Sequence, residues 1–93
     1  TGRGAAGEGR RRLMQTIFVM VKCELGRAYE VADSAVQSIE QVSEVYSISG
    51  QYDLIMKFHL DQEVDVGRFV TTSVQTLPGV KDTFTLISFK AFT

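Results

Sequence analysis

Cysteine and histidine are nearly absent from this chain of 93 residues, which has one of each, Cys23 and His59. A single cysteine excludes a disulfide framework within the chain and is typical of a reducing compartment. Two such residues cannot supply a Cys/His metal site, and a catalytic thiol would have only His59 as its base. We therefore interpret Cys23 as a small buried strand residue and His59 as a surface or packing residue, and we expect no metal and no cofactor.

Long apolar runs and an excess of positive charge are also missing. The longest apolar run, Ile17 to Val21, is the length of a strand, which predicts no membrane span and no signal peptide. The chain has 10 basic and 11 acidic residues, and four of the basic ones are arginines within the first twelve residues. The remainder is acidic, which is a poor surface for nucleic acid. These absences favour a cytoplasmic protein without direct membrane or DNA contact.

The length predicts one small domain whose core is marginal without oligomerisation. Four glycines and almost no apolar residues stand in the first twelve positions. We interpret residues 1–13 as a flexible tail or a cloning remnant, with Met14 as a candidate natural start, and residues 14–93 as the folded domain.

Hydrophobic periodicity predicts six elements in the order β-α-β-β-α-β. The strands are expected at residues 15–25, 45–49, 52–60 and 81–92, and the helices at 30–42 and 65–77, where Asp65 is a plausible N-cap. A short echo supports two similar halves, because the pattern Ser38-Ile39-x-x-Val42-x-x-Val45 returns as Ser73-Val74-x-x-Leu77-x-x-Val80. This order is typical of the α+β ferredoxin-like fold, a four-stranded antiparallel sheet with two helices on one face.

The faces of these elements predict which surfaces are buried. One face of each expected central strand is wholly apolar: Ile17, Val19, Val21, Cys23 and Leu25 in the first, and Tyr52, Leu54, Met56, Phe58 and Leu60 in the third. The first helix has an apolar stripe of Ala32, Ala35, Val36, Ile39 and Val42. Phe18 and Met20 lie on the other side of the sheet, where an uncovered apolar surface predicts dimerisation through the sheet.

The turn between the second and third strands carries the best candidate chemistry. Gly50-Gln51 suits a two-residue type II′ turn, whose first position needs a positive φ. Asp53 follows directly, although aspartate is depleted in strands. It is either a hairpin-end residue that accepts backbone hydrogen bonds or the partner of a ligand ammonium, with N–H groups around Gly50 receiving a carboxylate. The second alternative predicts an amino acid as the ligand.

Two motifs resemble the effector-binding domain of the Lrp/AsnC (leucine-responsive) regulators. They are Val-Tyr-Ser-Ile-Ser-Gly-Gln-Tyr-Asp-Leu-Ile-Met-Lys-Phe at 45–58 and Leu77-Pro78-Gly79-Val80-x-Asp82-Thr83-x-Thr85. The resemblance covers about residues 15–92 and agrees with the ferredoxin-like interpretation. It implies homodimers formed through the sheets, assembly into rings such as octamers, and amino acids bound between dimers. The implied ligand-binding residues are Gly50, Gln51, Tyr52, Asp53, Thr83 and Thr85.

Family regulators also have an N-terminal helix-turn-helix domain, which twelve polar residues cannot supply. The chain is therefore expected to be a stand-alone or an excised effector domain without direct operator binding. We expect it to sense an amino acid and to modulate transcription indirectly, through mixed assembly with a full-length Lrp/AsnC regulator.

Two alternatives remain open. One is an enzyme of the dimeric α+β barrel kind, such as a small monooxygenase, which predicts an internal polar cavity near His59 or Tyr46. The other is a structural assembly domain without a ligand. A packed interior and a cleft at the turn of residues 50–53 favour the binding domain.

Overall fold

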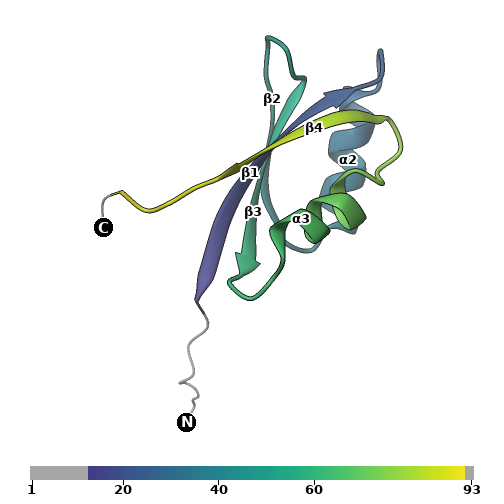
Figure 1. The fold of residues 1–93 in the computed structure, drawn as a ribbon. Helices are drawn as coiled ribbons and strands as arrows, with labels where there is room; N and C mark the ends of the chain where they lie inside the picture. Colours follow the sequence, from purple (N-terminus) through teal and green to yellow (C-terminus); the bar gives the residue numbers. More distant parts are fainter. Residues whose placement is uncertain (1–12, 92–93) are drawn as a thin grey trace.

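The computed structural model describes residues 13–91 and contains the predicted β-α-β-β-α-β order (Figure 1). Its elements are β1 (Met14–Cys23), α2 (Ala28–Ser38), β2 (Val42–Ser47), β3 (Leu54–Asp61), α3 (Val66–Phe69), the π-helix η1 (Val70–Val74) and β4 (Val80–Ile87). The antiparallel sheet has the order β2-β3-β1-β4, so β1 and β3 are central, as predicted. Both helices lie on the same side of the sheet (Figure 1). Residues 1–12 of the predicted tail lie outside the described residues, and the division of the chain at residue 13 stays a prediction.

The core lies between the sheet and the helices. Its members are apolar side chains from the helix-facing side of β1 and β3, from the helices and from the residues that follow them: Ile17, Val19, Val21, Cys23, Leu54, Met56, Phe58, Leu60, Val31, Ala35, Ile39, Phe69, Val70, Val74 and Leu77. Phe58 and Phe69 meet edge to face with their ring centroids 5.1 Å apart. No polar or charged side chain is buried among the described residues. Each large apolar side chain buried in this way stabilises the fold by about 1.5–3 kcal/mol.

The first strand and the first helix differ from the prediction at their boundaries. β1 ends at Cys23 rather than at residue 25, and Leu25 is fully exposed in the following turn. α2 begins at Ala28 and ends at Ser38. Most of the predicted stripe faces the core, because Ala35 and Ile39 are buried and Ala32 and Val42 pack against the core. Val31 and Ala35 are buried, whereas Val36, which was predicted to be buried, is 60% exposed. The predicted stripe is therefore wrong only at Val36, and Val31, four residues before Ala35, is buried in its place.

The second helical segment is not one regular helix over 65–77. Asp65 is its N-cap, as predicted, because its Oδ1 accepts a hydrogen bond of 3.2 Å from the backbone N–H of Arg68. The α-helical part is only Val66–Phe69, and η1 follows with an i→i+5 hydrogen bond of 2.9 Å from Gln75 N to the Val70 carbonyl. Residues of low helix propensity, including Gly67, leave packing to decide the geometry. The wider turn buries Val70 and Val74 together.

The last strand is shorter than predicted. β4 ends at Ile87 rather than at residue 92, and Phe92 lies outside the described residues. Within β4 the alternation is as predicted, with Phe84 and Leu86 on the face opposite to Thr83 and Thr85.

The sheet face away from the helices carries an apolar patch over β4, β1 and β3, with Lys22 and Lys57 on the same face. The register pairs Phe18 with Leu86 and Met20 with Phe84, and Met20 also pairs with Ile55 of β3. Phe84 and Leu86 are 51% and 41% exposed. We call this surface the open face. No helix among residues 13–91 has the length and apolar composition that a membrane crossing requires.

Gly79 should tolerate substitution less well than Gly26. Both have a positive φ, of 94° and 77°, which costs any other residue about 1–2 kcal/mol. A Cβ on Gly79 would also stand 2.9 Å from Cγ2 of the buried Val31, whereas nothing lies within 4 Å of a Cβ on Gly26. We expect Gly79→Ala to lower the free energy of unfolding by about 1–3 kcal/mol more than Gly26→Ala, measured by urea denaturation. Equal losses would show that only the backbone conformation matters.

Candidate functional site

The candidate site is the turn between β2 and β3. The last strand pair is Ser47 with Leu54, and beyond it the backbone N–H of Ile48 donates a 2.9 Å hydrogen bond to the Asp53 carbonyl. The bend is therefore formed by residues 49–52, and the predicted two-residue type II′ turn is wrong. Gly50 nevertheless has the expected positive φ, 118°. This backbone conformation explains glycine here, since nothing lies within 4 Å of a Cβ built on it.

Asp53 joins the turn to the end of β1. Its backbone N–H donates a 2.9 Å hydrogen bond to the Val21 carbonyl, and its Oδ2 accepts a 2.8 Å hydrogen bond from the backbone N–H of Cys23. The register of β1 with β4 shifts between Lys22 and Cys23, so the carboxylate takes a donor at an irregular point of the sheet. Asp53 therefore has the structural role that one of the two interpretations predicted. Its second oxygen, Oδ1, accepts no hydrogen bond from residues 13–91, which leaves it available to a ligand.

Two further contacts hold the turn in place. Nζ of Lys22 donates a 3.0 Å hydrogen bond to the carbonyl of Gln51. The ring of Tyr52 stacks on Phe84 with centroids 6.1 Å apart and an interplanar angle of 28°. Tyr52 thus lies on the open face and precedes β3, so its predicted place on the buried face with Leu54 is wrong. The backbone N–H groups of residues 49–52 donate no hydrogen bond to any residue that the structure describes.

The turn borders two hollows of different character. One has a volume of about 530 Å³ and four charged side chains, Lys22, Glu24, Asp53 and Lys81, in its wall. The other has a volume of about 390 Å³ and is lined by Met20, Gln51, Tyr52 and Phe84. We call them the charged hollow and the apolar hollow. Gln51 and Tyr52 therefore line the apolar hollow, and the next residue, Asp53, lines the charged one.

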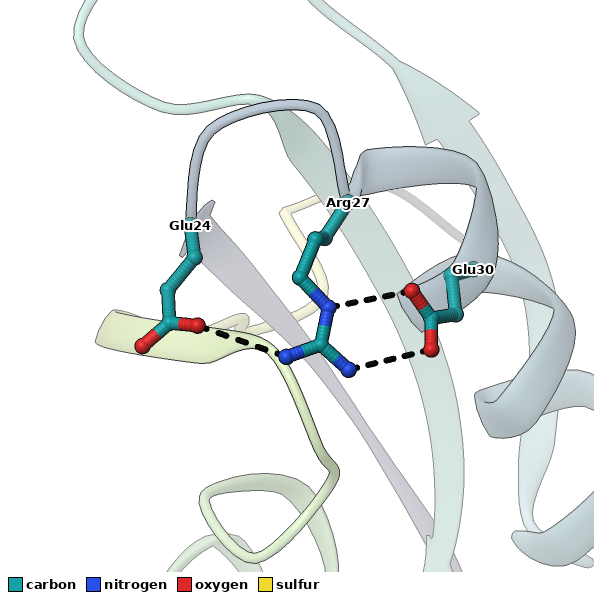
Figure 2. Close-up of polar contacts among 3 residues, drawn as sticks. All are labelled: Glu24, Arg27 and Glu30. Atoms are coloured by element: carbon teal, nitrogen blue, oxygen red, sulfur yellow. Dashed lines mark hydrogen bonds and ion pairs between the residues drawn. The ribbon is translucent and has the colours of Figure 1, made fainter.

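Arg27 pairs with Glu24, which lines the charged hollow, and with Glu30 of α2 (Figure 2). Its guanidinium donates two 3.0 Å hydrogen bonds to Glu30 and one of 3.3 Å to Glu24. The hydrogen bonds and charge of Arg27 lower the pKa of Glu30, and those of Glu30, followed by Glu24, raise the pKa of Arg27. Because the pKa of Glu30 is lower in the folded chain than in the unfolded chain, its ion pair with Arg27 stabilises the fold at neutral pH. This contribution is lost as the pH falls through the pKa of Glu30 in the folded chain. The ion pairs brace the loop after β1 against α2.

The two predicted threonines lie apart from the turn residues. Thr83 and Thr85 are on the helix-facing side of β4, opposite to Phe84, and Oγ1 of Thr83 accepts a 2.9 Å hydrogen bond from Gln75. The structure thus brings Gly50, Gln51, Tyr52 and Asp53 together but does not join these threonines to them. The ligand-binding role of all six residues stays a prediction.

The polar residues of the enzyme alternative do not form an internal site. His59 is exposed and its Nδ1 lies 3.1 Å from Oγ1 of Thr16, and the exposed Tyr46 donates a 2.9 Å hydrogen bond to Glu44. That hydrogen bond and the charge of Glu44 raise the pKa of Tyr46. The core between the sheet and the helices contains no polar side chain from residues 13–91. Within the same range no three His, Cys, Asp or Glu side chains gather as a metal site.

Fold and site together define a small ferredoxin-like domain with an open apolar sheet face and a surface turn rich in polar backbone groups. A family model described as the Lrp/AsnC ligand binding domain matches residues 16–93. The chain therefore belongs to the family of Lrp/AsnC ligand-binding domains, as the sequence motifs indicated.

Relatives of known sequence or structure agree with this assignment. The HTH-type transcriptional regulator FL11 of Pyrococcus abyssi is 32% identical over 73 residues, which are 78% of this chain and 47% of FL11. The leucine-responsive regulatory protein of Haemophilus influenzae is 28% identical over 75 residues, 76% of this chain and 45% of that protein. The chain thus spans about half the length of the curated relatives it matches. The structure of TTHA0845 from Thermus thermophilus is 32% identical with a TM-score of 0.75, covering 85% of this chain and 98% of TTHA0845.

Sequence reasoning missed the residues that surround the turn. Lys22 holds the Gln51 carbonyl, Met20 and Phe84 line the apolar hollow, and Lys81 lines the charged one. Met20 and Lys22 lie side by side on the less apolar face of the first strand, and this spacing could have grouped them on one surface. Their distance to the turn depends on the strand register, which the periodicity does not give.

Cys23 should react slowly with thiol reagents in the folded protein. Burial, followed by the negative charge of Asp53, raises the pKa of its thiol, so the reactive thiolate is scarce at neutral pH. We expect alkylation by iodoacetamide at pH 8, followed by mass spectrometry, to be much slower in buffer than in 6 M urea. The Asp53→Asn variant should react faster than the parent chain at the same pH, because the charge that raises the pKa is gone. Rapid alkylation of the folded parent would contradict this description of Cys23.

Proposed function

We propose that this domain senses an amino acid at the turn of residues 50–53 and regulates transcription indirectly, without being an enzyme. The observation that carries the proposal is a set of groups at one turn that have no hydrogen-bond partner within residues 13–91: the backbone N–H groups of residues 49–52 and Oδ1 of Asp53. An α-amino acid has a carboxylate and an ammonium, which need donors and a negative partner respectively. The turn offers both within a few residues.

The neighbouring lysines complete the charge pattern. Lys22 and Lys81 line the charged hollow beside Asp53, so a zwitterion finds both signs of charge there. The hollow is open to solvent, and a ligand held by one chain alone would be weakly enclosed. We therefore expect residues of a second dimer to complete the site. Thr83 and Thr85 are further from the turn and are proposed as secondary ligand residues.

The relatives support the regulatory part of the proposal. FL11 is named as a transcriptional regulator, and the Haemophilus influenzae relative is named as a leucine-responsive regulatory protein. We propose that the ligand shifts the assembly of this domain by its different affinity for the assembly states. The DNA contact would come from a full-length Lrp/AsnC regulator in the same cytoplasmic assembly.

The open face supports dimerisation as the first step of assembly. Phe18, Met20, Ile55, Phe84 and Leu86 form a continuous apolar surface across three strands, which a second copy of the sheet would remove from water. A dimer formed in this way would cover the ring of Tyr52 on the open face but would leave Gly50 and the charged hollow beside Asp53 accessible to another dimer. We propose that such contacts close a ring, for which an octamer is our expectation.

The site is tested by removing the charge of Asp53 while keeping its structural hydrogen bond. In Asp53→Asn the side-chain amide oxygen can still accept from the Cys23 N–H, whereas an alanine side chain cannot. We expect a thermal-shift screen of the twenty amino acids to identify a ligand, and Asp53→Asn to weaken its binding by about tenfold or more in calorimetry. Glu40→Gln, which removes an exposed carboxylate away from the turn, is the matched control and should bind normally. Unchanged affinity in Asp53→Asn would exclude this residue from the site.

The dimer is tested at Leu86. Replacing it by lysine places a charge beside Phe18 on the open face, and we expect light scattering to show monomers. Val36→Lys introduces the same charge on the exposed side of α2, at a residue that is 60% exposed, and should leave the oligomer unchanged. Loss of assembly in Val36→Lys but not in Leu86→Lys would place the interface on the helices instead.

A further inference from the structure

We infer that the outer side of α2 is a docking surface for a basic helix of a partner protein. α2 lies on the side of the sheet away from the open face, so its outer side stays accessible when the open face is covered (Figure 1). Four exposed residues define this surface, Tyr29, Asp33, Val36 and Glu40, and we call it the α2 face. It contains no residue of the turn between β2 and β3, so the inference is separate from the amino-acid site.

Two large apolar side chains give the α2 face its contact area. Tyr29 is 81% exposed and Val36 is 60% exposed. They are seven residues apart in α2, which places them on the same side of the helix and about 10 Å apart along its axis. One exposed apolar residue is ordinary on a protein surface. Two of them two turns apart on one helix match the spacing of the anchors by which helices recognise each other.

The charges around these two side chains are negative. Residues 28–44 contain four acidic and no basic side chains. Arg27, just before this stretch, is already paired with two other carboxylates. Neither Asp33 nor Glu40 forms an ion pair with a residue that the structure describes. Nε2 of Gln37 donates hydrogen bonds of 3.1 Å to both carboxylate oxygens of Asp33, which orients this carboxylate on the exposed surface.

This charge determines which kind of partner fits. A second copy that presented its own α2 face would bring Asp33 and Glu40 against like charges, which opposes association. Nucleic acid and anionic lipid would be repelled for the same reason. A helix with an apolar stripe flanked by lysine or arginine would instead cover Tyr29 and Val36 and pair with both carboxylates. A basic amphipathic helix of a partner protein is therefore the occupant that the α2 face fits.

Such a partner has a place in the proposed regulation. DNA-binding domains carry basic surfaces, so the full-length regulator proposed above would offer this chemistry. A basic helix held on the α2 face would be withheld from DNA for as long as it stays bound. The α2 face would thus affect transcription without any DNA contact by this chain.

The test uses a fluorescently labelled synthetic helix with a leucine stripe flanked by lysines, and a counterpart with glutamates in place of the lysines. In fluorescence anisotropy, we expect the parent chain to bind the lysine helix about tenfold or more tighter than the glutamate helix, and salt to weaken this binding. Val36→Lys, which places a positive charge on the α2 face, should weaken the binding about tenfold or more. Phe89→Lys is the matched control and should bind normally, because Phe89 is 85% exposed and lies after β4. Tyr29 is left unchanged because it also lines the charged hollow.

The contribution of charge is measured with two double variants. Asp33→Asn with Glu40→Gln removes two carboxylates from the α2 face and should weaken binding of the lysine helix several-fold at low salt. Glu44→Gln with Glu63→Gln removes the same charge from exposed positions outside this face and should bind as the parent chain does. Light scattering on every variant shows whether the homo-oligomer is intact.

The inference fails if the parent chain binds both synthetic helices equally, or if Val36→Lys binds the lysine helix as the parent does. It also fails if both double variants lose the same affinity, because the attraction would then be that of any acidic protein. A changed homo-oligomer in Val36→Lys would place the α2 face in a contact between copies and would overturn the inference as well. These results leave amino-acid binding at the turn untouched, since Asp53→Asn tests it separately.

Discussion

The geometry of the candidate site depends on the two hydrogen bonds that join Asp53 to the end of β1. The backbone N–H reaches the Val21 carbonyl, and the carboxylate takes the Cys23 N–H where the register of β1 with β4 shifts. An N–H left without an acceptor at a half-buried position would cost about 1–3 kcal/mol. Asp53 therefore has a structural role in a position where aspartate is unusual. Its two hydrogen bonds to β1 fix the preceding turn at the edge of the open face. The same contact uses only one carboxylate oxygen, so structural and ligand-binding roles are compatible in one residue.

The fold was largely predictable because two periodicities are strong in this sequence. The strict alternation of Ile17, Val19 and Val21 with Phe18 and Met20 identified a central strand, and the sheet order confirmed it. Boundaries and helix rotation were less predictable. Val36 fits an apolar stripe as well as Val31 does, and the choice between them depends on how α2 is rotated against the sheet. The π-helix was not predictable either, because packing rather than propensity decides it.

The candidate site was predictable at its centre and not at its edges. A glycine that needs positive φ and an aspartate out of place in a strand are local features, and both lie where the sequence indicated. The remaining walls come from residues distant in the chain, Lys22 from β1 and Phe84 from β4, which only the register of three strands brings to the turn. Tyr52 illustrates the difference, because alternation places it on the buried face, whereas the longer bend turns its ring onto Phe84. A two-residue turn would have kept the alternation in phase.

The arrangement also gives a physical route by which a ligand and a second subunit could influence each other. Met20 and Phe84 line the apolar hollow and at the same time belong to the open face, where Met20 pairs directly with Phe84 and Ile55. Under the proposed function, a second copy of the sheet would cover Met20 and Phe84 and so change the surroundings of the turn at which the ligand binds. If the ligand binds one assembly state more tightly, it must stabilise that state by the same factor, because the two equilibria are linked. Because the turn is open on the single chain, most of the affinity of the proposed site would depend on which other chains are present.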